Sequence, residues 1–163
     1  MKVTAERIRE LAFYDAESGK LIRKIRRGGR GGNGSAMGHA AGNGYLYAGI
    51  DYGYYTVHRL IWLYVTGEWP TEMIDHINGN KIDNRISNLR LATRSLNAAN
   101  SKARSSKKKK KGVYYDCRRD KFYAHISYEG RKMHIGAFDD ANSAHEAYMR
   151  AASKRYGEFS RFE

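Results

Sequence analysis

Cysteine is nearly absent from this chain of 163 residues, in which Cys117 is the single thiol. One cysteine excludes an internal disulfide and any zinc site built from cysteine pairs. Long apolar runs are also missing, since the longest, Leu60 to Val65, falls far short of the ~20 residues that a membrane-spanning helix needs. The first residues include Glu6 and Glu10 and have no charged-then-apolar signal pattern. These absences favour a soluble cytoplasmic protein.

Acidic residues are scarce relative to basic ones. The chain has 30 Lys and Arg against 17 Asp and Glu, which gives a formal charge of +13. Such a surplus predicts a polyanionic partner and does not indicate any particular fold. Residues 102–163 hold 16 basic and 8 acidic residues, and Lys102 to Lys111 carries seven positive charges in ten positions. A run of this kind is typical of a solvated linker, and it can also follow phosphates without recognising sequence.

The order of the expected elements divides the chain into four parts. The first is a β-rich extension with a helix over residues 3–13, a hairpin that turns at Ser18-Gly19, and Tyr-rich strands over residues 45–55. Residues 23–44 are rich in Arg and Gly and lack the phosphate-loop pattern. Both a flexible loop and a basic arm that orders on nucleic acid remain open for them. The four parts are residues 1–56, 57–101, 102–111 and 112–163.

One stretch carries side chains suited to hydrolysis. Asp75 and His76 are adjacent, and Asn78-Gly79-Asn80 after them is a turn signal. Asn88 begins an expected strand, and Asn97 lies on the short helix expected after it. An aspartate offers a hard oxygen ligand, and a histidine offers a base that is largely neutral near pH 7. The pattern predicts a hairpin and a helix that bring Asp75, His76 and Asn97 to one phosphodiester.

These residues resemble the HNH nuclease motif in the ββα-metal arrangement of phage and intron-associated, homing-type endonucleases. The flanking segments Val57-His58-Arg59-Leu60 and Gly67-Glu68-Trp69-Pro70 agree with the phage members. The resemblance implies that His76 is the general base. It implies that Asn88 braces the loop and orients His76. It further implies that Asp75 and Asn97 hold a metal ion.

The ligand types select the ion. Zinc would require Cys or several His, whereas a carboxylate and an amide oxygen favour Mg²⁺ or Mn²⁺. Two rivals remain, because Asn84 also fits the middle asparagine and Asn100 lies one helical turn beyond Asn97. His58, at the start of the helix expected from Val57 to Val65, is taken as a structural hydrogen bonder. His39 has no interpretation from the sequence.

The last fifty residues have a second pattern. Strands are expected over residues 112–118, 122–128 and 131–138, followed by an Ala-rich helix to about Tyr156. Alternation leaves one face of this sheet without a covering helix. The unit resembles the AP2 DNA-binding domain through Gly112-Val113, Ala124-His125-Ile126, Ile135-Gly136-Ala137-Phe138 and Ala144-His145-Glu146-Ala147-Tyr148.

The AP2 resemblance implies that the open sheet face lies in the major groove of DNA. His134 stands where plant members often have Trp, and His125 where they often have an acid, so their target sequence does not carry over. The implied DNA contacts are Lys111, Tyr114, Arg118, Tyr123, His125, Lys132 and His134.

Together the patterns predict an α+β protein. A ββα-metal HNH module with an N-terminal β-rich extension precedes an AP2-like three-stranded antiparallel sheet packed on one helix. The expected activity is metal-dependent cleavage of site-recognised double-stranded DNA, in the host cytoplasm if the protein is phage-encoded. Neither a membrane nor an obligate protein partner is expected, and a monomer would nick one strand. The alternatives are a sequence-specific DNA-binding regulator with an inactive nuclease site and an RNA-binding protein that uses the Arg-Gly and lysine segments.

Overall fold

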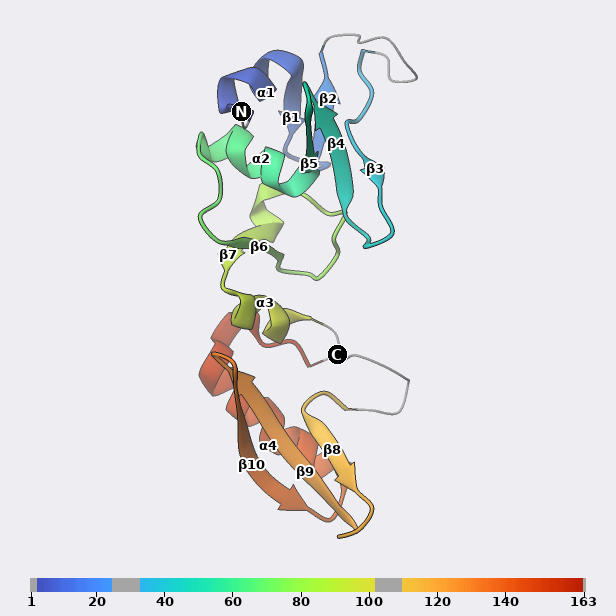
Figure 1. Ribbon diagram of the computed structural model, residues 1–163, viewed down its shortest axis with the longest axis vertical. Coiled ribbons are helices and arrows are strands. Elements are labelled where there is room, and N and C mark those ends of the chain that lie inside the picture. Colours follow the sequence, from blue (N-terminus) through green and yellow to red (C-terminus); the bar gives the residue numbers. More distant parts are fainter. Residues whose placement is uncertain (1–2, 25–32, 102–109, 163) are drawn as a thin grey trace. The chain divides into compact units, whose positions relative to one another are not determined.

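The computed structural model describes residues 3–24, 33–101 and 110–162 (Figure 1). The centre of the Arg-Gly segment and most of the expected basic linker lie outside these residues. Contacts between residues divide the chain into two compact units, Met1–Leu91 and Ala92–Glu163. The division falls ten residues before the boundary that the sequence suggests at residue 101, because the helix that bears Asn97 packs within the C-terminal unit.

The N-terminal unit contains three small sheets and two helices. β1 pairs antiparallel with β2, β4 lies between β3 and β5 in an antiparallel sheet, and β6 is joined to β7. Thr4 caps the first helix, since its Oγ1 accepts a hydrogen bond from the Arg7 amide at 3.2 Å. The elements are α1 (Ala5–Leu11), β1 (Ala12–Asp15), β2 (Lys20–Arg23), β3 (His39–Ala40), β4 (Leu46–Ile50), β5 (Gly53–Thr56), α2 (Val57–Thr66), β6 (Met73–His76), the 3₁₀ helix η1 (Ile86–Asn88) and β7 (Leu89–Ala92).

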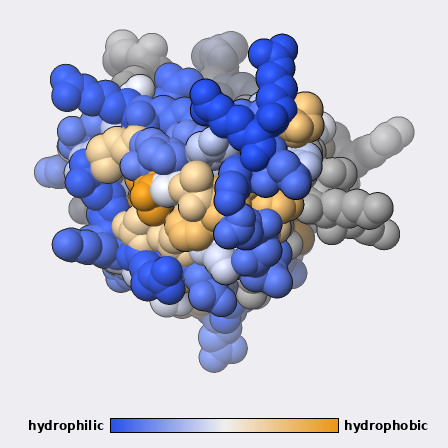
Figure 2. Space-filling view, turned by 90° about the horizontal axis from the view of Figure 1, so that it is seen from below, coloured by the Kyte–Doolittle hydropathy of each residue, from blue (hydrophilic) through white to orange (hydrophobic). Residues whose placement is uncertain are grey.

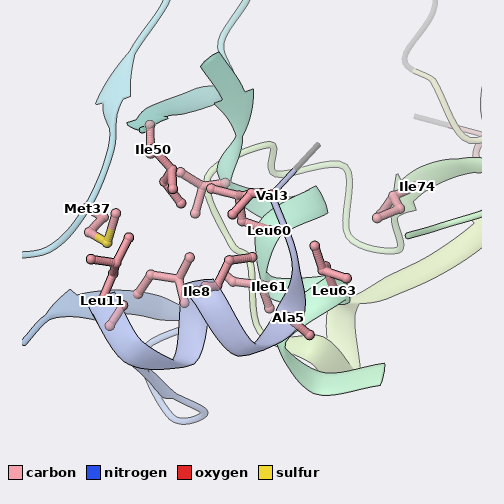
Figure 3. Close-up of a cluster of buried hydrophobic side chains, with 14 of the residues drawn as sticks. Val3, Ala5, Ile8, Leu11, Met37, Ile50, Leu60, Ile61, Leu63 and Ile74 are labelled. Atoms are coloured by element: carbon pink, nitrogen blue, oxygen red, sulfur yellow. The ribbon is translucent and has the colours of Figure 1, made fainter. Parts of the chain in front are cut away.

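A single hydrophobic core holds these elements together. Ile8 of α1 and Leu60 and Ile61 of α2 are fully buried at its centre (Figure 3). Ile74 of β6 and Leu89 of β7 belong to the same cluster, so the strand that ends at His76 is fixed to the core from the side of α2. α2, β6 and β7 therefore contribute to one core.

The C-terminal unit is an antiparallel sheet packed on one long helix. The strand order is β10-β9-β8, and α4 contacts all three strands. Asp140 caps α4 through its Oδ1, which accepts hydrogen bonds from the Asn142 and Ser143 amides. The elements are α3 (Arg94–Asn100), β8 (Val113–Asp116), β9 (Lys121–Tyr128), β10 (Arg131–Phe138), α4 (Ala141–Tyr156) and the 3₁₀ helix η2 (Gly157–Phe159).

Alternation along β9 separates the two faces of this sheet. Ala124 and Ile126 are buried against the alanine-rich face of α4, while Tyr123 and His125 belong to the opposite face. The register shifts between His134 and Gly136, where a bulge inserts one residue into β10. The expected three-stranded antiparallel sheet packed on one helix is thus present.

The described residues contain no helix with both the length and the apolar character that crossing a membrane requires.

Candidate functional site

Asp75 and His76 lie at the end of β6 and are both buried, with 4% of each residue exposed. Polar side chains at this depth need hydrogen-bond partners to offset the loss of water. β6 continues into the β6–β7 connection through a hydrogen bond from the Ile77 amide to the Asn88 carbonyl at 2.9 Å. One hydrogen-bond partner of His76 comes from this connection, and one of Asp75 comes from β7.

Arg90 is the partner of Asp75. Its Nε donates to Asp75 Oδ2 at 2.9 Å, and both side chains are largely buried. A charge-assisted hydrogen bond of this kind fixes the orientation of the carboxylate. The structure places Arg90 on β7 beside Asp75 and Arg94 at the start of α3 in the C-terminal unit.

Asn84 is hydrogen-bonded to the ring of His76. Its Oδ1 lies 2.9 Å from His76 Nε2, and only 1% of Asn84 is exposed. An amide oxygen can only accept a hydrogen bond, so this orientation of the Asn84 side chain corresponds to the tautomer with the ring proton on Nε2. Burial lowers the pKa of His76, while the Asn84 bond and the Asp75 charge oppose this shift. The ring is therefore held in its neutral form near pH 7.

Asn88 acts on the loop instead of on the ring. Its Oδ1 accepts from the Asn78 amide at 3.0 Å, and its Nδ2 donates to Asn78 Oδ1 at 3.0 Å and to the Asp83 carbonyl at 2.8 Å. The sequence suggested that Asn88 would both brace this loop and orient His76. In the structure these tasks are divided, because the ring contact belongs to Asn84.

The rings of His58 and Tyr45 also lie beside His76. The ring centroid of His58 lies 5.2 Å from that of His76 in an edge-on arrangement, and Tyr45 lies 5.1 Å from His58 and 5.9 Å from His76. Burial, with smaller effects from His76 and Arg59, lowers the pKa of His58 to about 3. Sequence analysis left His58 outside the site, since no local pattern connects α2 with the end of β6.

Lys81 reaches the same group of rings from the β6–β7 connection. Its Nζ lies 4.6 Å from the centroid of the Tyr45 ring and donates to the Asn43 carbonyl at 2.8 Å. Burial, and secondarily the charge of Asp75, raises the pKa of Tyr45. The ring therefore stays neutral and provides a face for the lysine cation.

His39, which the sequence left without interpretation, belongs to the β3–β4–β5 sheet. Its Nε2 is hydrogen-bonded to the hydroxyl of Tyr54, whose ring stacks on Tyr47 with centroids 5.2 Å apart. These three rings form one polar aromatic face, and Tyr54 is 59% exposed.

The two candidate metal-binding asparagines lie on α3, within the C-terminal unit. Asn97 is partly exposed and its amide donates to the Thr93 carbonyl at 3.0 Å, whereas the Asn100 side chain is buried. Across the parts of the chain that the structure describes, no three His, Cys, Asp or Glu side chains gather in a way that could hold a metal ion.

The open face of the C-terminal sheet brings together several of the expected DNA contacts. The ring of His134 lies 5.3 Å from that of His125 and 5.7 Å from that of Tyr123, measured between centroids. Burial, followed by the charges of Lys132 and His134, lowers the pKa of His125. Tyr114, Arg118 and Lys132 are exposed on the strands and turns of the same sheet. Lys111 differs from the other six residues, because its ammonium contacts main-chain carbonyls.

Hydrophobic residues also gather on the surface when the molecule is viewed from below (Figure 2). They form a central group surrounded by hydrophilic side chains. Single exposed apolar residues are normal on protein surfaces. In the strongly basic C-terminal unit, the aromatic side chains of Tyr114 and Tyr115 on β8 are also exposed.

A buried Asp-His pair, joined to β7 by an asparagine-braced loop, is an arrangement suited to hydrolysis of phosphodiesters. Comparison with known families agrees, since residues 55–99 match the family model described as HNH endonuclease. The similarity to the HNH endonuclease family thus covers β5 in part, α2, the Asp75–His76 pair and most of α3.

One curated relative is an uncharacterized HNH endonuclease of Acanthamoeba polyphaga mimivirus. It is 31% identical over 112 residues, which make up 68% of this chain and 58% of the relative. The chain thus spans less than two thirds of the length of this relative. No solved structure matches the chain.

Proposed function

We propose that the protein is a metal-dependent DNA endonuclease in which His76 is the general base. The observation that carries this proposal is the buried His76–Asn84 pair beside Asp75, within the segment that matches the HNH family. A neutral histidine with a fixed ring proton is the form that can accept a proton from an attacking water.

The geometry assigns separate tasks to the side chains around His76. Asn84 holds the Nε2 proton, so Nδ1 is the atom that accepts the proton of the water as it attacks phosphorus. Burial keeps the pKa of His76 low enough for the ring to be unprotonated before the reaction. Asn88 closes the loop that carries Asn84, and His58 packs against the edge of the His76 ring. Asn84 and Asn88 are therefore positioning residues.

The chemistry of the proposed ligands, an aspartate and an asparagine, suits a divalent ion of the hard type. Asp75 supplies a buried carboxylate whose orientation is fixed by Arg90, and Asn97 supplies the more exposed of the two candidate amide oxygens on α3. Oxygen ligands of this kind suit Mg²⁺ or Mn²⁺ better than Zn²⁺. When bound, the ion would neutralise the charge that develops on the phosphate and on the leaving oxygen.

The C-terminal unit is proposed to bind the duplex as an AP2-like domain. The support is the open sheet face with Tyr123, His125, Lys132 and His134, together with the +13 charge of the chain. Aromatic and histidine side chains on this face are suited to base edges, and Lys132 is suited to a phosphate. Double-stranded DNA is thus the proposed partner.

The test uses the full chain with duplex DNA, single-stranded DNA and RNA, each with and without Mg²⁺. Duplex cleavage that requires the metal is expected. His76→Ala should reduce the single-turnover rate by ~10²–10⁴-fold, because a general base contributes about this factor. DNA affinity, measured by gel shift, should stay nearly unchanged.

His39→Ala provides a matched control, since His39 lies in the same unit and bonds to Tyr54 instead of joining the His76 network. Its single-turnover rate at saturating enzyme should equal that of the wild type. Undiminished cleavage by the His76 variant would refute the assignment of the base. Tight duplex binding without cleavage by the wild-type chain would favour the DNA-binding regulator instead.

A further inference from the structure

The ammonium of Lys111 contacts the main chain of the protein, whereas a lysine that binds DNA phosphates has its ammonium exposed to solvent. The Nζ of Lys111 donates to the backbone carbonyls of Ala99, Ser101 (2.8 Å) and Arg161 (3.0 Å). An ammonium has three donors, so these carbonyls use its full capacity. Burial, with a smaller effect from Arg161, lowers the pKa of Lys111 to about 8. The cation is thus engaged with the main chain of its own unit.

The helix that Lys111 contacts cannot depend on its own hydrogen bonds for stability. α3 has seven residues, whereas isolated helices shorter than ~12 residues are marginal in water. Ala99 is buried in the C-terminal core and Leu96 packs against it. The last carbonyls of a helix lack partners within it, and a lysine ammonium satisfies such carbonyls and favours the negative end of the helix. Lys111 therefore supplies hydrogen-bond donors and a positive charge to the carbonyls at the C-terminal end of α3.

We propose that Lys111 is a positioning residue that anchors α3 and thereby fixes Asn97 within the C-terminal unit. The inference rests on the proposed function, in which Asn97 is a metal ligand. It replaces the DNA contact that the AP2 resemblance implied for Lys111. The C-terminal unit then has a second function besides DNA binding. Its Lys111 stabilises α3, the helix that carries the proposed metal ligand Asn97.

The stabilisation of α3 by Lys111 can be tested without measuring nuclease activity. Amide hydrogen exchange is measured on the full chain for the wild type, Lys111→Met and Lys111→Arg. Lys111→Met should speed the exchange of the Asn97 amide in α3 and of the Ser101 amide at its C-cap by a factor on the order of ten or more, because a charged hydrogen-bond partner is lost. The amides of β9 should change much less. Lys111→Arg keeps a cation with several donors and should restore most of the protection.

The functional consequence is tested by metal binding and by DNA binding separately. Lys111→Met should raise the Mn²⁺ concentration needed for half-saturation of the full chain, followed by electron paramagnetic resonance without DNA, in the same direction as Asn97→Ala. The slope of log affinity against log salt for duplex DNA should stay at the wild-type value. Lys132→Met is the matched control, and it should reduce that slope by ~0.9 and leave α3 exchange and Mn²⁺ binding unchanged.

Two results would overturn the proposal. A salt slope reduced by ~0.9 in Lys111→Met with unchanged α3 exchange would make Lys111 a phosphate contact. Equal acceleration of exchange in α3 and in β9 would show a general loss of stability with no specific anchor. If the wild-type chain neither binds Mn²⁺ nor cleaves DNA, the proposed function fails, while the exchange of α3 still decides whether Lys111 anchors this helix.

Discussion

Acid should destabilise the N-terminal unit through His58. This side chain is buried on α2, where it packs edge-on against the His76 ring and beside Tyr45. Its near neighbours offer no negative charge, since Tyr45 and Thr56 are neutral and His76 and Arg59 both disfavour a second cation. The folded protein therefore keeps His58 unprotonated at pH values at which an exposed histidine is charged.

The size of this acid destabilisation follows from the pKa of His58 in the unfolded and in the folded protein. Folding lowers the pKa of His58 from 6.5 to about 3, so below pH 6.5 the unfolded chain binds a proton that the folded chain does not. The stabilising effect of this difference is complete above pH 6.5 and is lost progressively as the pH falls toward 3. At about pH 5 the loss is ~2 kcal/mol, from roughly 1.4 kcal/mol per pH unit.

The assay is urea unfolding at about pH 7.5 and about pH 5, followed by tryptophan fluorescence. The two tryptophans of the chain, Trp62 and Trp69, both lie in the N-terminal unit, so the signal reports on that unit alone. His58→Gln replaces the imidazole by a neutral amide that does not titrate. Between the two pH values the variant should lose ~2 kcal/mol less unfolding free energy than the wild type. An equal loss in both proteins would refute a buried neutral His58.

Two further predictions concern the C-terminal unit. Gly112→Ala should lower the free energy of unfolding, measured in urea, by ~1–3 kcal/mol more than Gly130→Ala does. Both glycines have a φ of +77°, but a Cβ at Gly112 would lie 2.0 Å from Tyr148 Cδ2, whereas nothing lies within 4 Å at Gly130; equal costs would mean that the Tyr148 ring moves aside freely. Tyr123→Ala should relax sequence preference among duplexes selected from a random pool and leave the salt slope unchanged. A slope reduced by ~0.9 would make Tyr123 a phosphate contact instead.

Local signals allowed much of the fold to be predicted. α2 was expected from Val57 to Val65 and spans Val57–Thr66, because Gly67 with a φ of +83° ends it in the left-handed region. The helix expected over residues 3–13 ends at Leu11 instead. Ala12 begins β1, whose pairing with β2 outweighs the helical pattern. Capping and turn residues thus indicated the ends of elements well, except where a neighbouring strand competed.

The contacts around the site could not be predicted in the same way. Asp75 and His76 were found from the sequence because they are adjacent and followed by a turn signal. Asn84 was only a rival to Asn88, since spacing alone does not show which asparagine reaches the ring and which braces the loop. His58 approaches His76 only because α2 and β6 share one core. Such partners depend on long-range packing, which no local pattern encodes.

The packing of α3 within the C-terminal unit decides where this chain can be divided. A cut after residue 101, the boundary that the sequence suggests, would leave Asp75 and His76 in a unit with its own core but would remove the residues that stabilise α3. Lys111 and the core around Ala99 would be lost together, so Asn97 would no longer be held on an ordered helix. Loss of cleavage by such a fragment would therefore not show that the removed residues bind DNA. Within the whole chain, Lys111→Met perturbs the helix and Lys132→Met perturbs the open sheet face, so comparing these two variants separates the contributions that truncation would combine.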